Sequence, residues 1–178
     1  MRIVAIFALG AGLMGAEVLD SAAGGFTVKT TLNIKAAPDD VYRKLVHDVG
    51  DWWDPTHTFS GDAHNLKIED HPGGCFCEKL PNNGFVHNLE VIYVAPGKRI
   101  VLSGALGPLQ NVAAAGSMQI QLTPADGATK LDVIYTVNGY QAKGMTTWAG
   151  PVDMVLAQQF TRLKSFVETG NAAPAASK

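Results

Sequence analysis

The sequence predicts an α+β fold, in which an antiparallel sheet of about seven strands packs against one long C-terminal helix. Residues 26–35 alternate between apolar and polar side chains, as a strand with one buried face does. About six later segments repeat this alternation between turn signals. After Gly139 the apolar spacing becomes helical, and this helix is the only predicted element long enough to cover the sheet.

A short helix is predicted directly after the first strand. Pro38 suits the first helical position, and Asp39 and Asp40 follow in the first turn, where the helix dipole favours negative charge. Gly50 is expected to end this helix, and a second helical turn is expected near Trp52. The first strand is therefore followed by short helices before the sheet continues.

Turn signals separate the remaining strands. Residues 95–98 place Pro and then Gly at the two central positions, as a type II turn prefers. Residues 103–116 are small and apolar with several glycines, so we expect a long loop there. The predicted strands after the short helices cover residues 66–69, 75–80, 85–94, 99–102, 117–123 and 131–137.

The C-terminal helix is predicted from its apolar spacing and its end signals. Pro151 suits the first turn of a helix, and Gly170 suits its C-terminal stop. A helix of about 18 residues would be about 27 Å long. Its apolar stripe is expected to include Leu156, Phe160 and Leu163.

The N-terminus has the pattern of a removable export signal. Arg2 is followed by a continuous apolar or Gly run from Ile3 to Met14, which is too short for a bilayer span of roughly 20 residues. Small residues at 21–23 favour cleavage near Gly24, which would make the protein secreted or periplasmic. A buried N-terminal strand or helix is the alternative. The predicted parts are residues 1–23 (signal peptide), 24–170 (one domain) and 171–178 (disordered tail).

Composition and charge exclude some classes of partner. Hydrophobic residues make up 47% of the chain, which is enough for a core, and the formal net charge is −2. Nucleic-acid binding depends on a basic surface, so it has no electrostatic support here. The sequence has no polybasic run for anionic membranes, and we expect no transmembrane anchor in the mature form.

Four short motifs, taken in order, resemble the START-like (SRPBCC) superfamily. Residues 36–42 (Ala-Ala-Pro-Asp-Asp-Val-Tyr) resemble its opening after the first strand, and Trp52-Trp53 falls where such domains often carry Trp. Residues 73–78 (Gly-Gly-Cys-Phe-Cys-Glu) resemble its turn and strand, and residues 93–102 resemble its Pro-led hairpin. The resemblance covers residues 26–169, and is nearest to polyketide cyclase/dehydrase-like domains and to homologues of the heat-shock-protein ATPase activator.

This resemblance implies a helix-grip fold, in which a curved sheet wraps around the C-terminal helix. It also implies a cavity between sheet and helix, which in the superfamily usually holds a small hydrophobic molecule. It does not imply one reaction, because one fold supports many functions.

Two histidines and one glutamate are candidates for polar groups in such a cavity. His64 and His87 are in phase with apolar residues of their strands, and Glu78 shares a face with Phe76. A buried carboxyl close to an imidazole could exchange protons, since desolvation and pairing shift both pKa values. The alternative is that these residues are exposed or satisfied polar groups without a catalytic role.

The cysteines leave three alternatives open. In a regular strand, Cys75 and Cys77 project from the face opposite Phe76, with Cα atoms about 6.6–6.8 Å apart, at the upper limit for a disulfide. Export and a bulge in the strand would permit a bridge, while two buried thiols are an alternative. His71 precedes them at a spacing without a clear fourth ligand, so we predict no metal site and no cofactor.

Aromatic residues and one methionine are also predicted to line the cavity. Of Trp52 and Trp53, we expect one in the core and one at the cavity, because neighbouring residues point in different directions. Leu106 and Leu109 could contribute to the mouth. The predicted ligand-binding residues are Trp53, His64, Phe76, Glu78, His87, Tyr135, Trp148 and Met154.

These features predict a binder or carrier of a small hydrophobic molecule, lipid-like or polycyclic. No nucleophile elbow, phosphate loop or dinucleotide motif occurs in the sequence, so no catalytic residue is assigned. One alternative is a cyclase-like or lyase-like enzyme that uses His64 or His87 with Glu78 and Tyr135. Another is a protein-interaction module. Neither the oligomeric state nor the ligand follows from the sequence.

Overall fold

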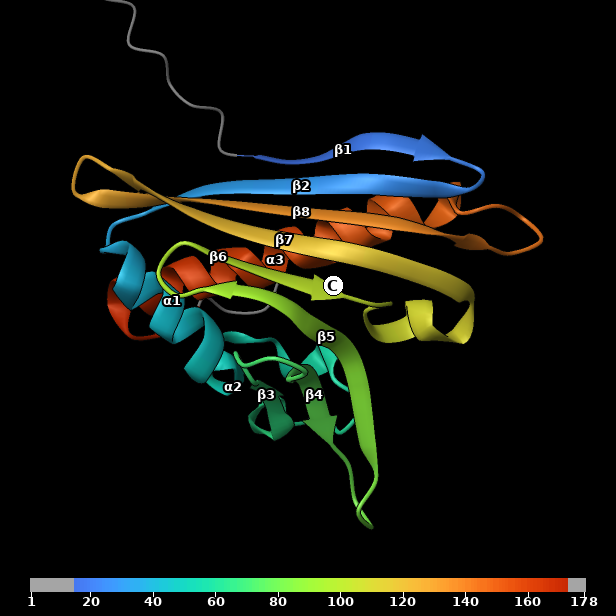
Figure 1. The fold of residues 1–178 in the computed structure, drawn as a ribbon, viewed down its shortest axis with the longest axis horizontal. Helices are drawn as coiled ribbons and strands as arrows, with labels where there is room; N and C mark the ends of the chain where they lie inside the picture. Colours follow the sequence, from blue (N-terminus) through green and yellow to red (C-terminus); the bar gives the residue numbers. More distant parts are fainter. Residues whose placement is uncertain (1–14, 173–178) are drawn as a thin grey trace, which may run out of the picture.

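A computed structural model describes residues 15–172 as one antiparallel sheet with a long helix against one face (Figure 1). The sheet has eight strands in the order β1-β2-β8-β7-β6-β5-β4-β3. The α+β class, the short helices after the first predicted strand and the long C-terminal helix are therefore confirmed. The sheet has one strand more than expected, because residues 15–22 form β1 at its edge.

The elements have the following bounds. The strands are β1 (Gly15–Ala22), β2 (Gly25–Ile34), β3 (Leu66–Ile68), β4 (Cys75–Lys79), β5 (Phe85–Ala95), β6 (Arg99–Ser103), β7 (Ala113–Ala125) and β8 (Ala128–Tyr140). The α-helices are α1 (Pro38–His47), α2 (Val49–Trp52) and α3 (Thr146–Thr169), and the 3-10 helices are η1 (Pro55–His57), η2 (Ala63–Asn65) and η3 (Gly107–Asn111).

Strand β1 lies inside the segment predicted to be a signal peptide. It pairs antiparallel with β2, and all eight of its residues are exposed. The apolar run of that predicted signal lies in residues 1–14, outside the described residues, as do residues 173–178 of the predicted tail. Cleavage near Gly24 remains a prediction, and of the described residues it would remove only exposed ones, 15–23.

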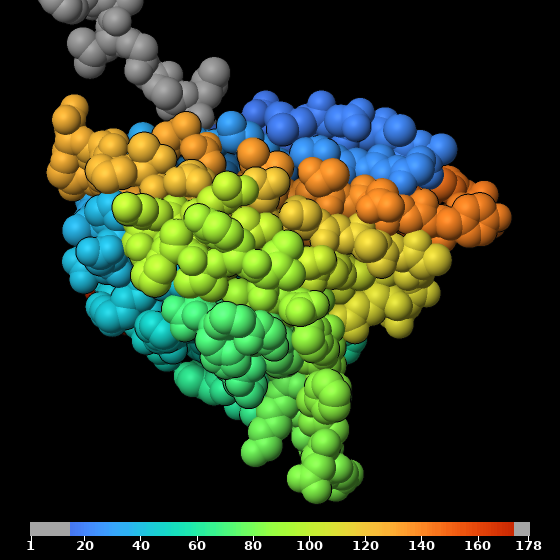
Figure 2. All heavy atoms as spheres, viewed as in Figure 1, coloured from blue at the N-terminus to red at the C-terminus, as the bar shows by residue number. Residues whose placement is uncertain are grey.

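Local sequence signals account for most element boundaries. The 95–98 turn is of the predicted kind: Gly97 has a φ of 69°, and the Lys98 N–H donates to the Ala95 carbonyl at 2.9 Å. Helix α3 ends at Gly170, whose φ of 80° provides the left-handed cap. The β4–β5 hairpin turns through Asn82 and Asn83 and projects from the body of the protein (Figures 1 and 2).

Two elements begin earlier than the sequence predicted. Strand β7 starts at Ala113 inside the predicted 103–116 loop, because residues 113–116 continue the pairing with β8. Gly116 fits there because a Cβ would come within 2.8 Å of the Tyr135 ring. Helix α3 starts at Thr146, so Pro151 lies inside the helix rather than at its start. Because proline has no backbone N–H, the helix lacks one i→i−4 hydrogen bond at Pro151.

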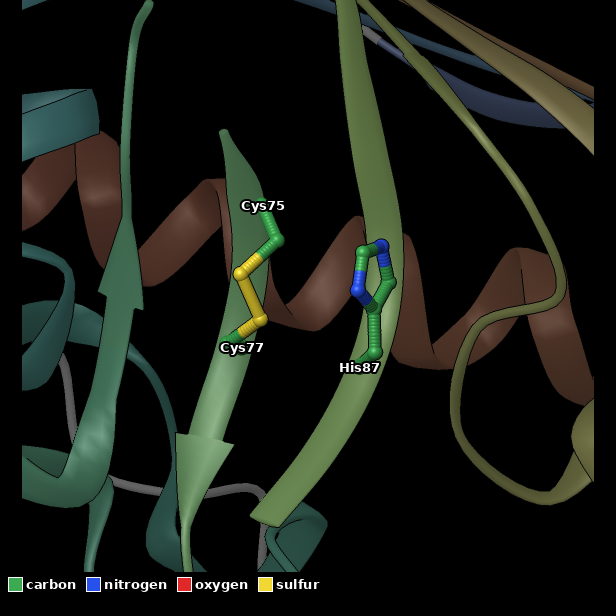
Figure 3. Close-up of side chains that lie close together, drawn as sticks. All are labelled: Cys75, Cys77 and His87. Atoms are coloured by element: carbon green, nitrogen blue, oxygen red, sulfur yellow. A yellow bond between two sulfur atoms is a disulfide. The ribbon is translucent and has the colours of Figure 1, made fainter. Parts of the chain in front are cut away.

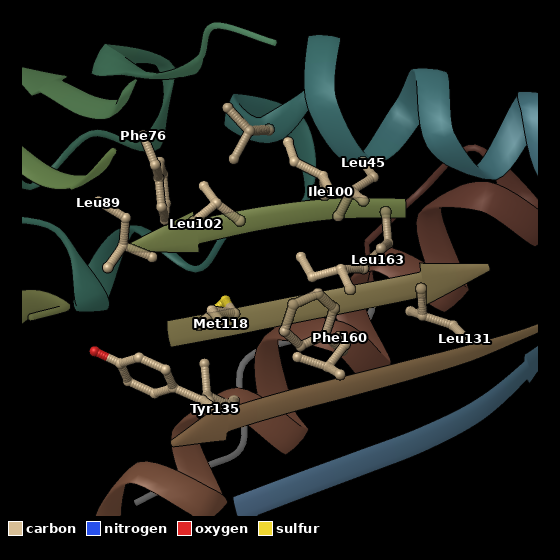
Figure 4. Packing of buried hydrophobic residues seen from close by; sticks show 14 of the residues in the cluster. Leu45, Phe76, Leu89, Ile100, Leu102, Met118, Leu131, Tyr135, Phe160 and Leu163 are labelled. Carbon is tan, nitrogen blue, oxygen red and sulfur yellow. The ribbon is translucent and has the colours of Figure 1, made fainter. Parts of the chain in front are cut away.

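The core lies between the sheet and α3 (Figure 4). Leu156, Phe160 and Leu163 point from α3 toward the sheet and are buried, as the apolar stripe predicted. Trp52 also joins this core, with its ring 5.9 Å from that of Phe160. Between residues 15 and 172, no helix is long and apolar enough to cross a membrane.

Candidate ligand cavity

A cavity of about 270 Å³ lies between the sheet and α3, on the side toward β4 and β5. Its wall combines strand residues with the first turns of α3, the loop around η1, and η3. Leu106 and Leu109, which were expected at the mouth of the cavity, both line the cavity. The lining residues at the predicted positions are Trp53, Phe76, Glu78, Tyr135 and Trp148.

Trp53 and Phe76 form an aromatic wall. Their ring centroids are 5.2 Å apart in an edge-to-face arrangement, and both residues are buried. The Trp53 indole N–H donates to the His57 carbonyl at 3.1 Å, which satisfies its polar atom. Trp53 therefore lines the cavity while Trp52 packs in the core, as the alternation of neighbouring side chains predicted.

Asp54 fixes the loop that carries this wall. Its carboxylate accepts hydrogen bonds from the Thr56 N–H at 2.9 Å and the Thr56 hydroxyl at 2.8 Å, and from the Gln158 amide at 2.8 Å. Its own N–H donates to the Gln159 side chain at 2.8 Å. Burial acts to raise the pKa of Asp54, but the Thr56 hydrogen bonds and the Arg162 charge outweigh it and lower the pKa. An ionised Asp54 thus ties the η1 loop to α3.

Glu78 is a buried carboxylate in the cavity wall. Only 1% of the residue is exposed. Its two oxygens accept hydrogen bonds from the backbone N–H groups of Phe59 and Ser60. Since a carboxylate offers about four acceptor sites, two amides leave capacity for a donor on a bound molecule.

Tyr135 closes the inner end of the cavity and is fully buried. Its hydroxyl donates to the Gly104 carbonyl at 2.9 Å and accepts from the Leu106 N–H at 3.0 Å. Burial raises the pKa of Tyr135 to about 12, although the Leu106 N–H acts to lower it. The phenol is therefore neutral at physiological pH and holds the loop before η3 in place.

His64 does not point into the cavity, which corrects the prediction. It lies in η2 rather than in a strand, so its phase with Leu66 is lost. Its side chain is 73% exposed and makes ion pairs with Asp62 at 3.1 Å and Asp51 at 3.4 Å. The hydrogen bond that the His64 ring donates to the Asp62 carboxylate is the main cause of the raised pKa of His64.

His87 also lies outside the cavity, and a β-bulge is the reason. Cys77 pairs with His87 and Phe76 pairs with Leu89, so Asn88 is an extra residue in β5. The bulge reverses the alternation, and both Asn88 and Leu89 are buried while His87 is exposed. Asn88 takes the cavity position instead. The residues around Asn88 contain no local turn signal, so the bulge could not be predicted from the sequence.

Met154 is the third correction. It is 66% exposed on the outer side of α3, two residues from both Val152 and Leu156, which line the cavity. A displacement of two residues on a helix is about 200°, so Met154 faces away from them. The early start of α3 also brings Trp148 and Pro151 into the wall.

These placements exclude His64 and His87 from the alternative function, an enzyme that uses a histidine with Glu78 and Tyr135 for acid–base catalysis. His64 and His87 cannot meet Glu78 inside the cavity, because both lie on the outer side of the sheet. Glu78 and Tyr135 share the cavity, but each is engaged by backbone groups. His57 contributes only to the exposed rim.

Cys75 and Cys77 form a disulfide on the outer face of β4 (Figure 3). Their Cα atoms are 5.3 Å apart, closer than in a regular strand, and the bulge in the β4–β5 pairing lies beside them. This decides among the three alternatives in favour of the bridge. The pair faces away from the cavity, whereas Phe76 between them lines it.

An eight-stranded antiparallel sheet packed against a long C-terminal helix is a helix-grip fold, the fold that the sequence resemblance implied. No protein-family model and no curated protein matches the chain.

Among solved structures, a conserved protein of unknown function from Enterococcus faecalis, EF2215, is similar at 19% identity and a TM-score of 0.63. That match covers 93% of this chain and 84% of EF2215. DynU16 from the dynemicin biosynthetic locus matches at 18% identity and a TM-score of 0.58, over 82% of this chain and 48% of DynU16. Ara h 8.0201 matches at 15% identity and a TM-score of 0.55, over 81% and 98% of the two chains.

Proposed function

We propose that this protein binds and carries a small, mostly apolar molecule in the cavity between the sheet and α3. The observation that carries the proposal is a cavity that remains open between well-packed elements and is walled by Trp53, Phe76, Trp148 and Leu156. Protein interiors normally close such space, because unfilled volume forfeits packing energy. Small-molecule sites are typically apolar clefts with a few polar groups, and this cavity has that composition.

The polar groups of the cavity indicate the ligand's chemistry. The Glu78 carboxylate can accept further hydrogen bonds, and Asn88 also lines the cavity. We therefore propose a ligand with an apolar body and one hydroxyl or amine donor directed at Glu78. A volume of about 270 Å³ lies just below the usual range for ligand pockets, roughly 300–1,000 Å³, and favours a compact ligand over a long-chain lipid.

The proposal is tested with N-phenyl-1-naphthylamine, a neutral fluorescent probe that has two aromatic units and one N–H donor. Saturable binding by the purified protein is expected, as is recovery of a co-purifying apolar molecule by extraction and mass spectrometry. Val152→Phe should weaken probe binding at least tenfold, since Val152 lines the cavity. Met154→Phe on the exposed side of the same helix is the matched control and should change it less than twofold.

Two results would count against a binding function. One is the absence of saturable probe binding together with no co-purifying molecule. The other is equal binding by the Val152→Phe and Met154→Phe variants, which would place the probe elsewhere on the surface.

We further propose that the protein acts outside the cytoplasm, after cleavage near Gly24. All eight residues of β1 are exposed at the edge of the sheet, and cleavage after this strand would leave the other strands intact. Burial and the charge of Glu17 on β1 both raise the pKa of Asp153 on α3, so losing β1 would remove an unfavourable contact between two acids. A disulfide also suits an oxidising compartment.

N-terminal sequencing of protein from the cell envelope or medium tests the export proposal. A mature chain that begins near Gly24 is expected. Soluble cytosolic protein with Met1 intact would refute it, and would leave the cavity proposal untouched.

A further inference from the structure

Three soft or borderline metal ligands meet on the outer face of the β4–β5 hairpin (Figure 3). The ligand atoms of Cys75, Cys77 and His87 all lie within 4.8 Å of one another. Cys77 and His87 are direct cross-strand partners, so the backbone pairing holds the imidazole beside the sulfurs. The bulge at Asn88 is what turns His87 to this face, and it therefore creates the cluster.

The disulfide itself contributes little as a structural staple. A bridge stabilises a protein mainly by closing a loop in the unfolded chain, and the gain falls as the loop shortens. Cys75 and Cys77 are separated by one residue and lie in a strand that is paired on both sides, with β3 and β5. Because the strand is already held, the pair is better explained by the chemistry of its two sulfurs.

We propose that the dithiol form of Cys75 and Cys77, together with His87, binds one Cu(I) ion, and that the disulfide form closes this site. Thiolates are soft ligands that favour Cu(I), and imidazole also suits copper. Three donors complete a trigonal Cu(I) site, whereas structural zinc almost always takes four ligands. The His71 spacing considered from the sequence is not needed, since His87 supplies the nitrogen.

The redox step balances with a dithiol reductant. One reductant thiolate attacks the Cys75–Cys77 bond to form a mixed disulfide, and its second thiol then displaces the protein sulfur. The reductant leaves as its own disulfide, and two electrons and two protons pass to Cys75 and Cys77. Cu(I) then replaces the two thiol protons. Transfer of two electrons back to a small-molecule disulfide restores the bridge and releases the ion.

The surroundings of the cluster suit this exchange. Glu69 Oε2 lies 3.5 Å from Cys75 Sγ, where it can accept a thiol proton. Cys75, Cys77 and His87 line a shallow hollow on the outer face, and Lys67 and Lys79 line it as well. Two thiolates with Cu(I) carry a net charge of −1, which the positive charge of the lysines favours. Cys75 and Cys77 are buried, but both line this hollow together with the exposed His87, so an ion or a reductant approaches the sulfurs through the hollow.

The experiment compares the oxidised protein with protein reduced by a phosphine and freed of it under anaerobic conditions. Cu(I) is supplied in acetonitrile and competed with bathocuproine disulfonate, whose copper complex is measured by absorbance. The reduced protein should retain one Cu(I) per chain, and the oxidised protein none. His87→Ala should weaken retention at least tenfold, and the Cys75→Ser, Cys77→Ser double variant should abolish it.

His71→Ala is the matched control, because His71 is exposed close to Cys75 in sequence but outside the cluster. It should change Cu(I) affinity less than twofold. Binding of N-phenyl-1-naphthylamine and circular dichroism verify that each variant is folded. Equal retention by oxidised and reduced protein, or an unchanged affinity in folded His87→Ala, would overturn the proposal. Loss of affinity in His71→Ala equal to that in His87→Ala would overturn it as well.

Discussion

Helix α3 offers a direct test of which faces the fold buries. Leu163 is completely buried in the core beneath the sheet (Figure 4). Leu163→Ala removes three carbon atoms, worth roughly 2.4 kcal/mol in transfer free energy at about 0.8 kcal/mol each. The cavity left behind adds to this loss, so we expect a total destabilisation of about 2–5 kcal/mol.

Leu156 and Met154 on the same helix should respond differently. Leu156 is also buried, but one side of it already faces the open cavity, so fewer packing contacts are lost. We expect Leu156→Ala to cost about 2 kcal/mol, at the low end of the range for a buried leucine. Met154→Ala changes an exposed side chain and should stay within about 0.5 kcal/mol of wild type.

Urea unfolding followed by circular dichroism measures all three free energies under one condition. The comparison requires similar denaturant slopes, because a changed slope would indicate an altered unfolded state. A destabilisation below about 0.5 kcal/mol for Leu163→Ala would refute the assigned face of α3. A larger loss for Leu156→Ala than for Leu163→Ala would refute the open cavity beside Leu156.

Three further outcomes are expected. Burial acts to raise the pKa of Asp54, but the Thr56 hydrogen bonds outweigh it and the pKa of the folded state is lowered. Ionised Asp54 therefore stabilises the fold at pH values above its pKa in the unfolded chain, about 4. This stabilisation is lost as the pH falls through the pKa of the folded state. Asp54→Asn should therefore be less stable at pH 7, by a margin that narrows below about pH 4; a margin independent of pH in urea unfolding would contradict this. The Cys75→Ser, Cys77→Ser variant should change cavity-probe affinity less than about threefold, under 1 kcal/mol, whereas a hundredfold loss in folded protein would place the sulfurs in the cavity. Gly97→Ala should lower stability by about 1 kcal/mol or more, because its φ of 69° is left-handed, and an unchanged melting temperature would contradict the turn.

The fold could be predicted because its signals are local and repeated. The alternation of Phe26, Val28 and Leu32 requires one buried strand face, and all three residues are buried in β2. The turn at Gly97 and the helix stop at Gly170 each depend on one residue with a specific backbone conformation. Such features need no information about distant parts of the chain.

The candidate site was predicted only in part. The wrong assignments concern the face of a strand or helix from which a side chain projects. Trp53, Phe76, Glu78, Tyr135 and Trp148 lie in the cavity wall, as regular alternation and loop position suggested. One extra residue at Asn88 was enough to reverse the orientation of His87. A bulge is a property of two paired strands, so the sequence of one strand does not reveal it.

The same bulge explains how one hairpin serves two separate sites. On β4, Phe76 and Glu78 line the cavity, while Cys75 and Cys77 line the hollow on the outer face, which Glu78 also borders. On β5, the extra residue lets Asn88 join the inner set and His87 join the outer set, although they are neighbours in the chain. The backbone hydrogen bonds of the strand pair separate the two sets. Cys75 and Cys77 are themselves buried, but they line a hollow on the outer face, so exchange at the sulfurs can proceed there without passing a ligand in the cavity.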